Sequence, residues 1–233
     1  LFRMLMLGLV VARLAFVLVY AEFYRDEPWR VVDIRDGGFI AWPGAATDGR
    51  RYLMQALQQG ASACLMEAQD HEPWLEAVSP EWHSALAVMP GLKAQTGWVA
   101  DAYYQHPSQA LSVLAVTGTN GKTSTAWWLA QALSSPALQQ ACGLVGTLGV
   151  GQLPHLVSTG MTTPDPVLLQ RQFRTFADAG VLHCAIEASS IGLAEHRLAG
   201  TQIRVVGAVR KVKRLCWWQQ KVRKKILVAS GFL

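Results

Sequence analysis

Cysteine is scarce in this chain of 233 residues, and acidic residues are missing from its last part. No aspartate or glutamate follows Glu195. The sequence also lacks internal repeats and low-complexity segments. The cysteines are widely spaced and form no CxxC pair, which argues against a zinc or disulfide framework and favours reduced thiols in the cytosol. They are Cys64, Cys142, Cys184 and Cys216.

The net charge of +5 belongs to one end of the chain. Nine of the 21 basic residues lie between Arg204 and Lys225. The rest of the chain holds 12 basic and 16 acidic residues, a balance of −4. The main part is therefore a mildly acidic globular sequence. A hydrophobic content of 51% is ample for the core of one large or two modest domains.

The sequence begins with Leu1 instead of methionine, and an apolar run follows from Met4 to Ala21. This run of 18 residues is interrupted by Arg13, and its length is at the lower edge for crossing a bilayer. A signal peptide or membrane anchor, a buried helix, and a stretch outside the reading frame are the alternatives. The interior arginine favours the last two, so we treat residues 1–38 as an atypical N-terminal segment.

Alternating strand and helix signals begin at Phe39. A short buried strand is expected from Phe39 to Trp42, then a helix from Arg50 to Gln59 that Gly60 ends, then a strand from Ala61 to Glu67. The residues His106-Pro107-Ser108 mark the expected end of this first region.

A second α/β region follows with clearer signals. Strands are expected at 111–117, around 143–150 and at 181–187, and helices at 123–134 and 166–179. Strands and helices that alternate in this way imply a parallel, doubly wound sheet. The expected fold class is therefore α/β, with a small N-terminal α/β domain followed by a truncated P-loop sheet of the doubly wound kind.

The segment TGTNGKTS at residues 117–124 is typical of a loop that binds the phosphates of a nucleotide. Gly118 and Gly121 let the backbone turn its N–H groups toward anionic oxygens, and the next helix adds a favourable dipole. Lys122 would reach the β- and γ-phosphates, and the Thr123 hydroxyl would bind Mg²⁺. Because Val116 replaces the first glycine of the usual pattern, a plain glycine turn before a helix is the alternative. The candidate ATP-binding residues are Gly118, Thr119, Asn120, Gly121, Lys122, Thr123 and Ser124.

With that valine, the loop resembles the ATP loop of the Mur ligases, the ATP-dependent amide ligases of peptidoglycan precursor synthesis. Two further segments, TTPDP at 162–166 and EASSIGLAEHR at 187–197, resemble the branch of this family that adds the third residue of the stem peptide. Residues 39–68 resemble the uridine-nucleotide-binding domain of the same enzymes. Three motifs in the same order are far more specific than one glycine loop.

The resemblance implies a domain organisation and a reaction. Residues 39–108 would bind the uridine nucleotide, and residues 109–206 would be part of the central ATP-binding domain. The reaction joins UDP-MurNAc-L-Ala-D-Glu to a diamino acid, with meso-diaminopimelate favoured, through an acyl phosphate and with ATP and Mg²⁺. Such an enzyme is cytoplasmic and needs neither nucleic acid nor a membrane. The oligomeric state is left open.

The resemblance also implies roles for individual side chains. Lys122 and Glu187 are the expected catalytic residues, and Thr123 and Glu187 the expected magnesium ligands. Glu187 ends a predicted strand, where open α/β sheets bind ligands; a solvated carboxylate is the alternative. Arg197 is expected to bind the D-glutamate carboxylate; an exposed surface arginine is the alternative. The other expected substrate-binding residues are Ala45, Ala46 and Thr47 for the uridine nucleotide, Thr162 and Thr163 for the muramoyl portion, and Ser189 and Glu195 beside Arg197.

The sequence departs from the family pattern at both ends. Residues 29–38 lack the Asp-Ser-Arg segment that helps to bind the uridine part. After Val206 the family continues into an Asp-His segment, a carbamylated lysine and a C-terminal domain, whereas residues 207–233 form a basic tail unlike the family. This tail could bind nucleic acid or an anionic membrane, replace lost structure, or be translated in the wrong frame, and the abrupt change favours the last. We therefore expect a truncated portion of the enzyme that is inactive alone.

Two other functions remain as alternatives. The first is a non-catalytic nucleotide-binding or membrane-associated module built on the apolar run and the basic tail. The second is a small P-loop kinase or GTPase, which is disfavoured because no base-recognition motif accompanies the loop.

Overall fold

The computed structural model describes residues 38–44, 47–135, 138, 140–209 and 226–227. These residues form two compact units, which divide between Leu92 and Lys93. The apolar N-terminal run and nearly all of the basic tail lie outside the described residues. Within the described part, none of the helices combines the length and the apolar character that a bilayer span requires.

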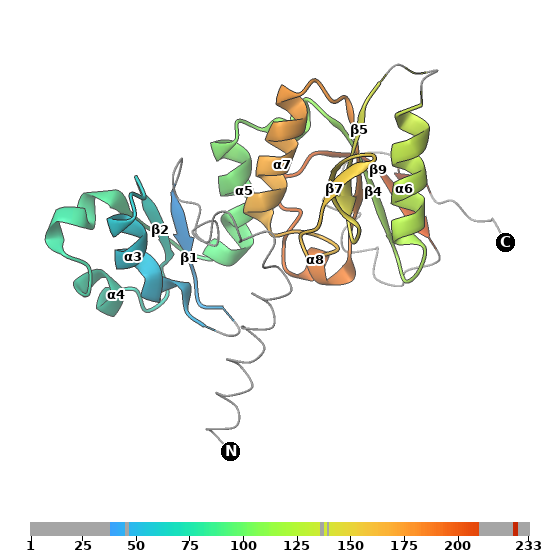
Figure 1. Ribbon diagram of the computed structural model, residues 1–233. Coiled ribbons are helices and arrows are strands. Elements are labelled where there is room, and N and C mark those ends of the chain that lie inside the picture. Colours follow the sequence, from blue (N-terminus) through green and yellow to red (C-terminus); the bar gives the residue numbers. More distant parts are fainter. Residues whose placement is uncertain (1–37, 45–46, 136–137, 139, 210–225, 228–233) are drawn as a thin grey trace. The chain divides into compact units, whose positions relative to one another are not determined.

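The first unit is built on a small parallel sheet with short helices on its connections (Figure 1). The strand order is β1-β2-β3, and both neighbouring pairs run parallel. Its core buries Leu53, Leu57 and Met66, so the α/β rhythm expected for this region is confirmed. The elements are β1 (Phe39–Ala41), η2 (Gly49–Tyr52), α3 (Leu53–Gln58), β2 (Cys64–Glu67), α4 (Glu72–Glu76), η3 (Pro80–Ala85) and β3 (Leu86–Met89).

The second unit contains a seven-stranded sheet in the order β10-β9-β4-β8-β5-β6-β7. The first five strands run parallel, as expected. The last two are antiparallel, which the sequence did not indicate. Only two residues separate β5 from β6, too few for the crossover that a parallel neighbour needs. The strands are β4 (Ser112–Gly118), β5 (Cys142–Gly146), β6 (Gly149–Gln152), β7 (His155–Val157), β8 (His183–Glu187), β9 (Ile203–Val209) and β10 (Ile226–Leu227).

Helices cover both faces of this sheet. The helices α6 (Lys122–Leu133) and α7 (Pro166–Asp178) lie on opposite sides of it in Figure 1. Each packs on its own cluster of buried side chains, around Ala130 for α6 and around Phe173 and Phe176 for α7. The doubly wound arrangement expected from the sequence is therefore confirmed.

The start of α7 shows why these helix bounds could be predicted closely. The Asp165 side chain accepts hydrogen bonds from the backbone N–H groups of Val167 and Leu168, both at 3.0 Å. Pro166 takes the first helical position, where its missing N–H costs nothing. Gly180, with φ of +71°, follows the helix and ends it.

The helix α5 (Leu92–Tyr103) packs on the second unit, and the two compact units divide after its first residue. A Cβ at Gly97 would lie 2.3 Å from the carbonyl oxygen of Ala199, so α5 approaches that segment as closely as only glycine permits. Two short helices complete this unit, η4 (Pro107–Gln109) and α8 (Ser190–Ala194).

The described cysteines are free thiols that are shielded from solvent. Burial raises the pKa of Cys64 and of Cys142 to about 11, and it raises the pKa of Cys184 well above the ordinary range. At pH 8 a thiol with a pKa of about 11 is about one-thousandth ionised, and the thiolate is the reactive form.

Cys216 lies outside the described residues. We expect a Cys216→Ser variant to react with an aromatic disulfide reagent only as fast as it unfolds, and a rapid reaction in the absence of denaturant would contradict this.

Candidate functional site

The turn between β4 and α6 depends on two glycines. Gly118 has φ of +141°, and a Cβ there would lie 2.2 Å from the carbonyl oxygen of Val209 on the neighbouring strand β9. Gly121 has φ of +78° and directly precedes α6. Residues other than glycine rarely adopt such backbone angles, so the turn requires both glycines.

The N-terminus of α6 offers donors to an anion. Among the described residues, no side chain caps it, and the first N–H groups of a helix have no partner within the helix. The Lys122 ammonium lies over the same turn and donates a hydrogen bond of 2.9 Å to the Gly118 carbonyl oxygen. Backbone donors, a helix dipole and an ammonium therefore meet at one place, which suits phosphate oxygens.

Glu187 lies at the carboxyl end of β8, between β4 and β5, and is almost fully buried at 1% exposure. Its Oε2 accepts a hydrogen bond of 2.9 Å from the Thr123 hydroxyl. Its Oε1 accepts one of 2.8 Å from the backbone N–H of Thr147. A Cβ at Gly146 would lie 2.3 Å from that same oxygen, so the carboxylate occupies space that only a glycine leaves open. The carboxylate and the Thr123 hydroxyl are thus held side by side.

The TTP segment is tied to the backbone around Glu187. The Thr163 hydroxyl lies 2.7 Å from the Glu187 carbonyl oxygen, and it accepts a hydrogen bond of 3.0 Å from the Ser189 N–H. Thr163 is buried, and a Cβ placed on Gly192 would lie 2.7 Å from the Cβ of Thr163. The Arg197 Nη1 donates to the Thr163 carbonyl oxygen at 2.8 Å. Arg197 therefore anchors the TTP segment.

Glu195 lies on the surface and pairs with Lys93 of α5 at 2.5 Å. The hydrogen bond from Lys93 lowers the pKa of Glu195, and the charge of Arg197 acts in the same direction. The sequence did not indicate Lys93 as a partner, because the two residues are about a hundred positions apart. Glu195 therefore carries a negative charge beside a cation.

Thr147 is a residue of the site that sequence reasoning missed. Its hydroxyl lies 3.0 Å from the Thr162 hydroxyl and 3.5 Å from the Thr123 hydroxyl. The available signal was its position directly after the buried strand β5, at the carboxyl edge of the parallel sheet. Residues there face the same edge as the loop after β4 and the end of β8.

Most of the expected site residues gather at this edge of the second unit. Thr119 and Asn120 form the turn, and Ser124 lies in the first turn of α6. Thr162, Thr163, Ser189 and Arg197 adjoin Glu187 through the contacts above. Thr47 lies exposed in the first unit. Ala45 and Ala46 lie outside the described residues.

The oxygen ligands at this edge fit magnesium. Among the described residues, no group of three or more histidine, cysteine, aspartate or glutamate side chains could hold a metal. Magnesium does not need such a cage, because it is usually held by one or two carboxylates together with phosphates and water. The adjacent oxygens of Thr123 and Glu187, beside a loop suited to phosphates, match that requirement.

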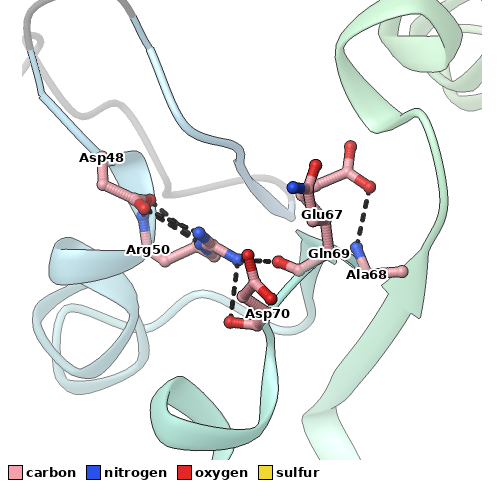
Figure 2. Close-up of polar contacts among 6 residues, drawn as sticks. All are labelled: Asp48, Arg50, Glu67, Ala68, Gln69 and Asp70. Atoms are coloured by element: carbon pink, nitrogen blue, oxygen red, sulfur yellow. Dashed lines mark hydrogen bonds and ion pairs between the residues drawn. The ribbon is translucent and has the colours of Figure 1, made fainter.

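The first unit contains a buried arginine, Arg50, that is 6% exposed (Figure 2). Its Nε and Nη2 donate to the Asp48 carboxylate at 3.0 and 2.8 Å. Its Nη1 donates to the carbonyl oxygens of Gln69 and Asp70, and its guanidinium lies 5.2 Å from the centre of the Trp74 ring. Arg50 therefore ties the loop after β1 to the loop after β2.

The Glu67 carboxylate, also drawn in Figure 2, binds backbone donors that follow β2 and β3. Its oxygens accept from the N–H groups of Ala68 at 2.9 Å, Gly91 at 3.0 Å and Leu92 at 2.7 Å. Burial by itself raises the pKa of Glu67, but these backbone hydrogen bonds outweigh it, so the pKa lies below its ordinary value. Backbone N–H groups of the first unit thus stabilise Glu67 as an anion.

We expect Asp48→Asn to lower the free energy of unfolding of the first unit by about 2 kcal/mol at pH 7, since hydrogen bonds between charged partners are worth that much. The hydrogen bond from Arg50 is the main cause that lowers the pKa of Asp48. Because the folded pKa is depressed, this stabilisation is present above about pH 4 and is lost as the pH falls through the folded pKa.

Urea unfolding of the wild type and the variant, followed by tryptophan fluorescence, tests this dependence. The difference between them should be largest near neutral pH and should shrink at pH 3. Glu76→Gln, a change of another carboxylate in the same unit, is the control. A difference of equal size at both pH values would show that the ion pair does not stabilise the fold.

Comparison with known proteins agrees with this geometry. Residues 116–209 match the Mur ligase middle domain. The UDP-N-acetylmuramoyl-L-alanyl-D-glutamate–2,6-diaminopimelate ligase of Acidovorax sp. (strain JS42) is 60% identical over 174 residues, which are 72% of this chain and 34% of that protein. The protein of the same name from Janthinobacterium sp. (strain Marseille) is 44% identical over 167 residues, 70% of this chain and 32% of that protein.

A solved structure of a ligase of that name is similar as well, with a TM-score of 0.58 and 31% identity over 76% of this chain and 34% of that one. The chain spans about a third of the length of the curated relatives it matches. The matched segment contains the glycine loop, the TTP segment and Glu187, and the relatives share one name. The chain therefore belongs to the Mur ligase family, and the curated relatives that it matches carry the name of 2,6-diaminopimelate ligases.

Proposed function

We propose that this chain carries the ATP-binding part, and a share of the substrate-binding part, of an amide ligase. The reaction adds a diamino acid to UDP-MurNAc-L-Ala-D-Glu in peptidoglycan precursor synthesis. The relatives' name gives this diamino acid as 2,6-diaminopimelate, and we propose its meso form. The observation that carries this proposal is the pairing of Glu187 with Thr123 at 2.9 Å beside an uncapped helix and a glycine loop. We propose a cytoplasmic location, since two of the three substrates of this reaction, ATP and UDP-MurNAc-L-Ala-D-Glu, are nucleotides.

An amide ligase must activate a carboxylate, which is otherwise a poor electrophile. In this reaction the γ-phosphoryl group of ATP passes to the D-glutamate carboxylate, and the amine of the diamino acid then displaces phosphate. The protein's contribution to such transfers is mainly orientation and charge neutralisation. The Lys122 ammonium would contact the phosphates and neutralise part of their charge, and it would give up its present hydrogen bond to the Gly118 carbonyl oxygen.

Thr123 and Glu187 are the residues that would hold Mg²⁺ in this proposal. The metal would neutralise charge between the β- and γ-phosphates. The Gly146 and Thr147 backbone holds the Glu187 carboxylate in place before any ligand binds. A ligand that is already oriented loses little conformational entropy when the metal arrives, so the site binds more tightly than one on a mobile side chain.

The substrate side of the proposed site is the TTP segment with Ser189 and Arg197. Arg197 reaches this segment through its Nη1, which donates to the Thr163 carbonyl oxygen at 2.8 Å. A guanidinium has five N–H donors, and its planar fork is suited to a carboxylate such as that of D-glutamate. Residues 39–108, with Ala45, Ala46 and Thr47, are proposed to bind the uridine nucleotide, and residues 109–206 to bind ATP.

Displacement of a fluorescent N-methylanthraniloyl ATP by ATP with Mg²⁺ tests the nucleotide part of the proposal. We expect the purified chain to bind, and Lys122→Met to bind at least about tenfold more weakly, because a charge-assisted contact is lost. Lys93→Met removes the same charge from the same unit without touching the loop, so it should bind as the wild type does. If the wild type shows no saturable binding, or if Lys122→Met binds equally well, the assignment of this loop to ATP binding is wrong.

A further inference from the structure

Thr147 contacts both sides of the candidate site. Its backbone N–H donates to the Glu187 Oε1 at 2.8 Å. Its hydroxyl lies 3.0 Å from the Thr162 hydroxyl, on the proposed substrate side, and 3.5 Å from the Thr123 hydroxyl, on the proposed metal side. Through these contacts Thr147 reaches Thr123, Thr162 and Glu187 together.

The backbone of Thr147 is held in place from several directions. It follows β5, whose five residues are all buried, and it begins the two-residue connection to the antiparallel strand β6. Gly149, the first residue of β6, has φ of +130°, and a Cβ there would lie 2.6 Å from the Val157 carbonyl oxygen. The residues on both sides of this turn are therefore closely packed, and they present the exposed Thr147 side chain.

Each threonine hydroxyl can donate only one hydrogen bond, and this limit suggests a role for Thr147 between Thr123 and Thr162. Thr123 has one hydroxyl proton, which the structure directs at Glu187. When Thr123 and Glu187 both serve as cation ligands through oxygen, we expect the Thr123 hydroxyl to turn its hydrogen bond from Glu187 to another acceptor. The Thr147 hydroxyl oxygen lies 3.5 Å from the Thr123 hydroxyl and can accept this hydrogen bond, and Thr147 then donates its own hydroxyl hydrogen bond to Thr162.

We propose that Thr147 is a positioning residue that links occupation of the metal side to the orientation of Thr162 on the substrate side. This inference rests on the proposed function. In the chain without ligand, Thr147 fixes the Glu187 carboxylate through its N–H. With nucleotide and magnesium bound, its hydroxyl accepts from Thr123 and donates to Thr162, so that the TTP segment is held in the arrangement that accompanies a loaded nucleotide site.

Hydroxyl-specific variants test this role. Thr147→Val keeps the side-chain shape and the backbone N–H but removes the hydroxyl, and Thr147→Ser keeps the hydroxyl. We expect Thr147→Val to bind ATP with Mg²⁺ about fivefold more weakly, the factor that one ordinary hydrogen bond contributes. Its affinity for ATP in the presence of EDTA should change less than about twofold, and Thr147→Ser should restore the wild-type values.

Thr175→Val is the matched control, because it removes a hydroxyl that bonds to the Arg171 carbonyl oxygen on α7, away from the site. Equal weakening of ATP binding with and without magnesium in Thr147→Val would overturn the inference, since a purely structural role has that effect. The inference also fails if Thr147→Val binds as the wild type does while the wild type itself responds to magnesium.

A second measurement keeps the inference separate from the proposed function. The equilibrium constants of unfolding are compared for Thr147→Val, Thr162→Val and the double variant. If the two hydroxyls bond to each other, the double variant changes the constant by less than the product of the two single factors. Factors that simply multiply overturn the inference. A wild-type chain that binds no nucleotide overturns the proposed function, while this cycle still decides whether Thr147 and Thr162 are linked.

Discussion

Gly118→Ala is expected to lower the free energy of unfolding of the second unit by about 4 kcal/mol and to abolish nucleotide binding. The figure combines the strain of a non-glycine residue at an unfavourable φ with the cost of forcing atoms into occupied space. The added Cβ would lie 2.2 Å from the Val209 carbonyl oxygen. That oxygen belongs to the main chain of β9, which pairs with β4 and cannot move without breaking the ladder.

A matched alanine variant separates the two costs. Gly180 has φ of +71°, but a Cβ there would meet nothing within 4 Å. Gly180→Ala should therefore cost only about 1 kcal/mol, which is the strain of the backbone angle alone. Chemical denaturation of both variants measures the two values. If Gly118→Ala were no less stable than Gly180→Ala, the close approach of β9 to the loop would be wrong.

Glu187→Gln is expected to remove the magnesium dependence of nucleotide binding while leaving the fold nearly intact. The amide has the same shape as the carboxylate. Its oxygen can accept from the Thr147 N–H, and its NH₂ group can donate to the Thr123 hydroxyl, so we expect stability within about 1 kcal/mol of the wild type. The lost charge is the one that would bind Mg²⁺, and neutral amides bind this ion poorly.

Titration with ATP, in magnesium and in EDTA, measures this effect. We expect the affinity in magnesium to fall by more than about tenfold, the factor that loss of a charged contact of about 1.4 kcal/mol or more produces. In EDTA the affinity should be unchanged or higher, because a negative charge beside the phosphates is gone. Asp178→Asn, which removes an exposed carboxylate on α7, is the control. Retention of the full magnesium effect in Glu187→Gln would assign the metal to other ligands.

Local signals in the sequence were sufficient for the elements that carry the nucleotide site. Hydrophobic runs and caps predicted β4, α6 and α7 to within about one residue, because capping and periodicity depend on neighbours along the chain. The glycine loop was predicted for the same reason: its φ values and its following helix are local properties. The position of Glu187 at the edge of the parallel sheet followed from the order of strands and helices.

Contacts between distant residues could not be predicted in this way. Thr147 was missed because its partner Glu187 lies 40 positions away, and a threonine in a turn carries no chemical signal of its own. The antiparallel edge of the sheet was missed because short apolar strands do not indicate the direction of their neighbours. The partner of Glu195, Lys93, lies in a helix that the expected domain boundary had placed outside the second unit.

The amino-acid sequence alone was thus enough to identify the α/β class, the phosphate loop and the family, because each depends on residues that are close along the chain or ordered along it. The tertiary structure decided which of these residues act together. It brought Thr123 within 2.9 Å of Glu187 across 64 positions and placed Thr147 between them and Thr162. Such contacts arise only when strands far apart in sequence are paired, since the strand order determines which loops meet at one edge of the sheet.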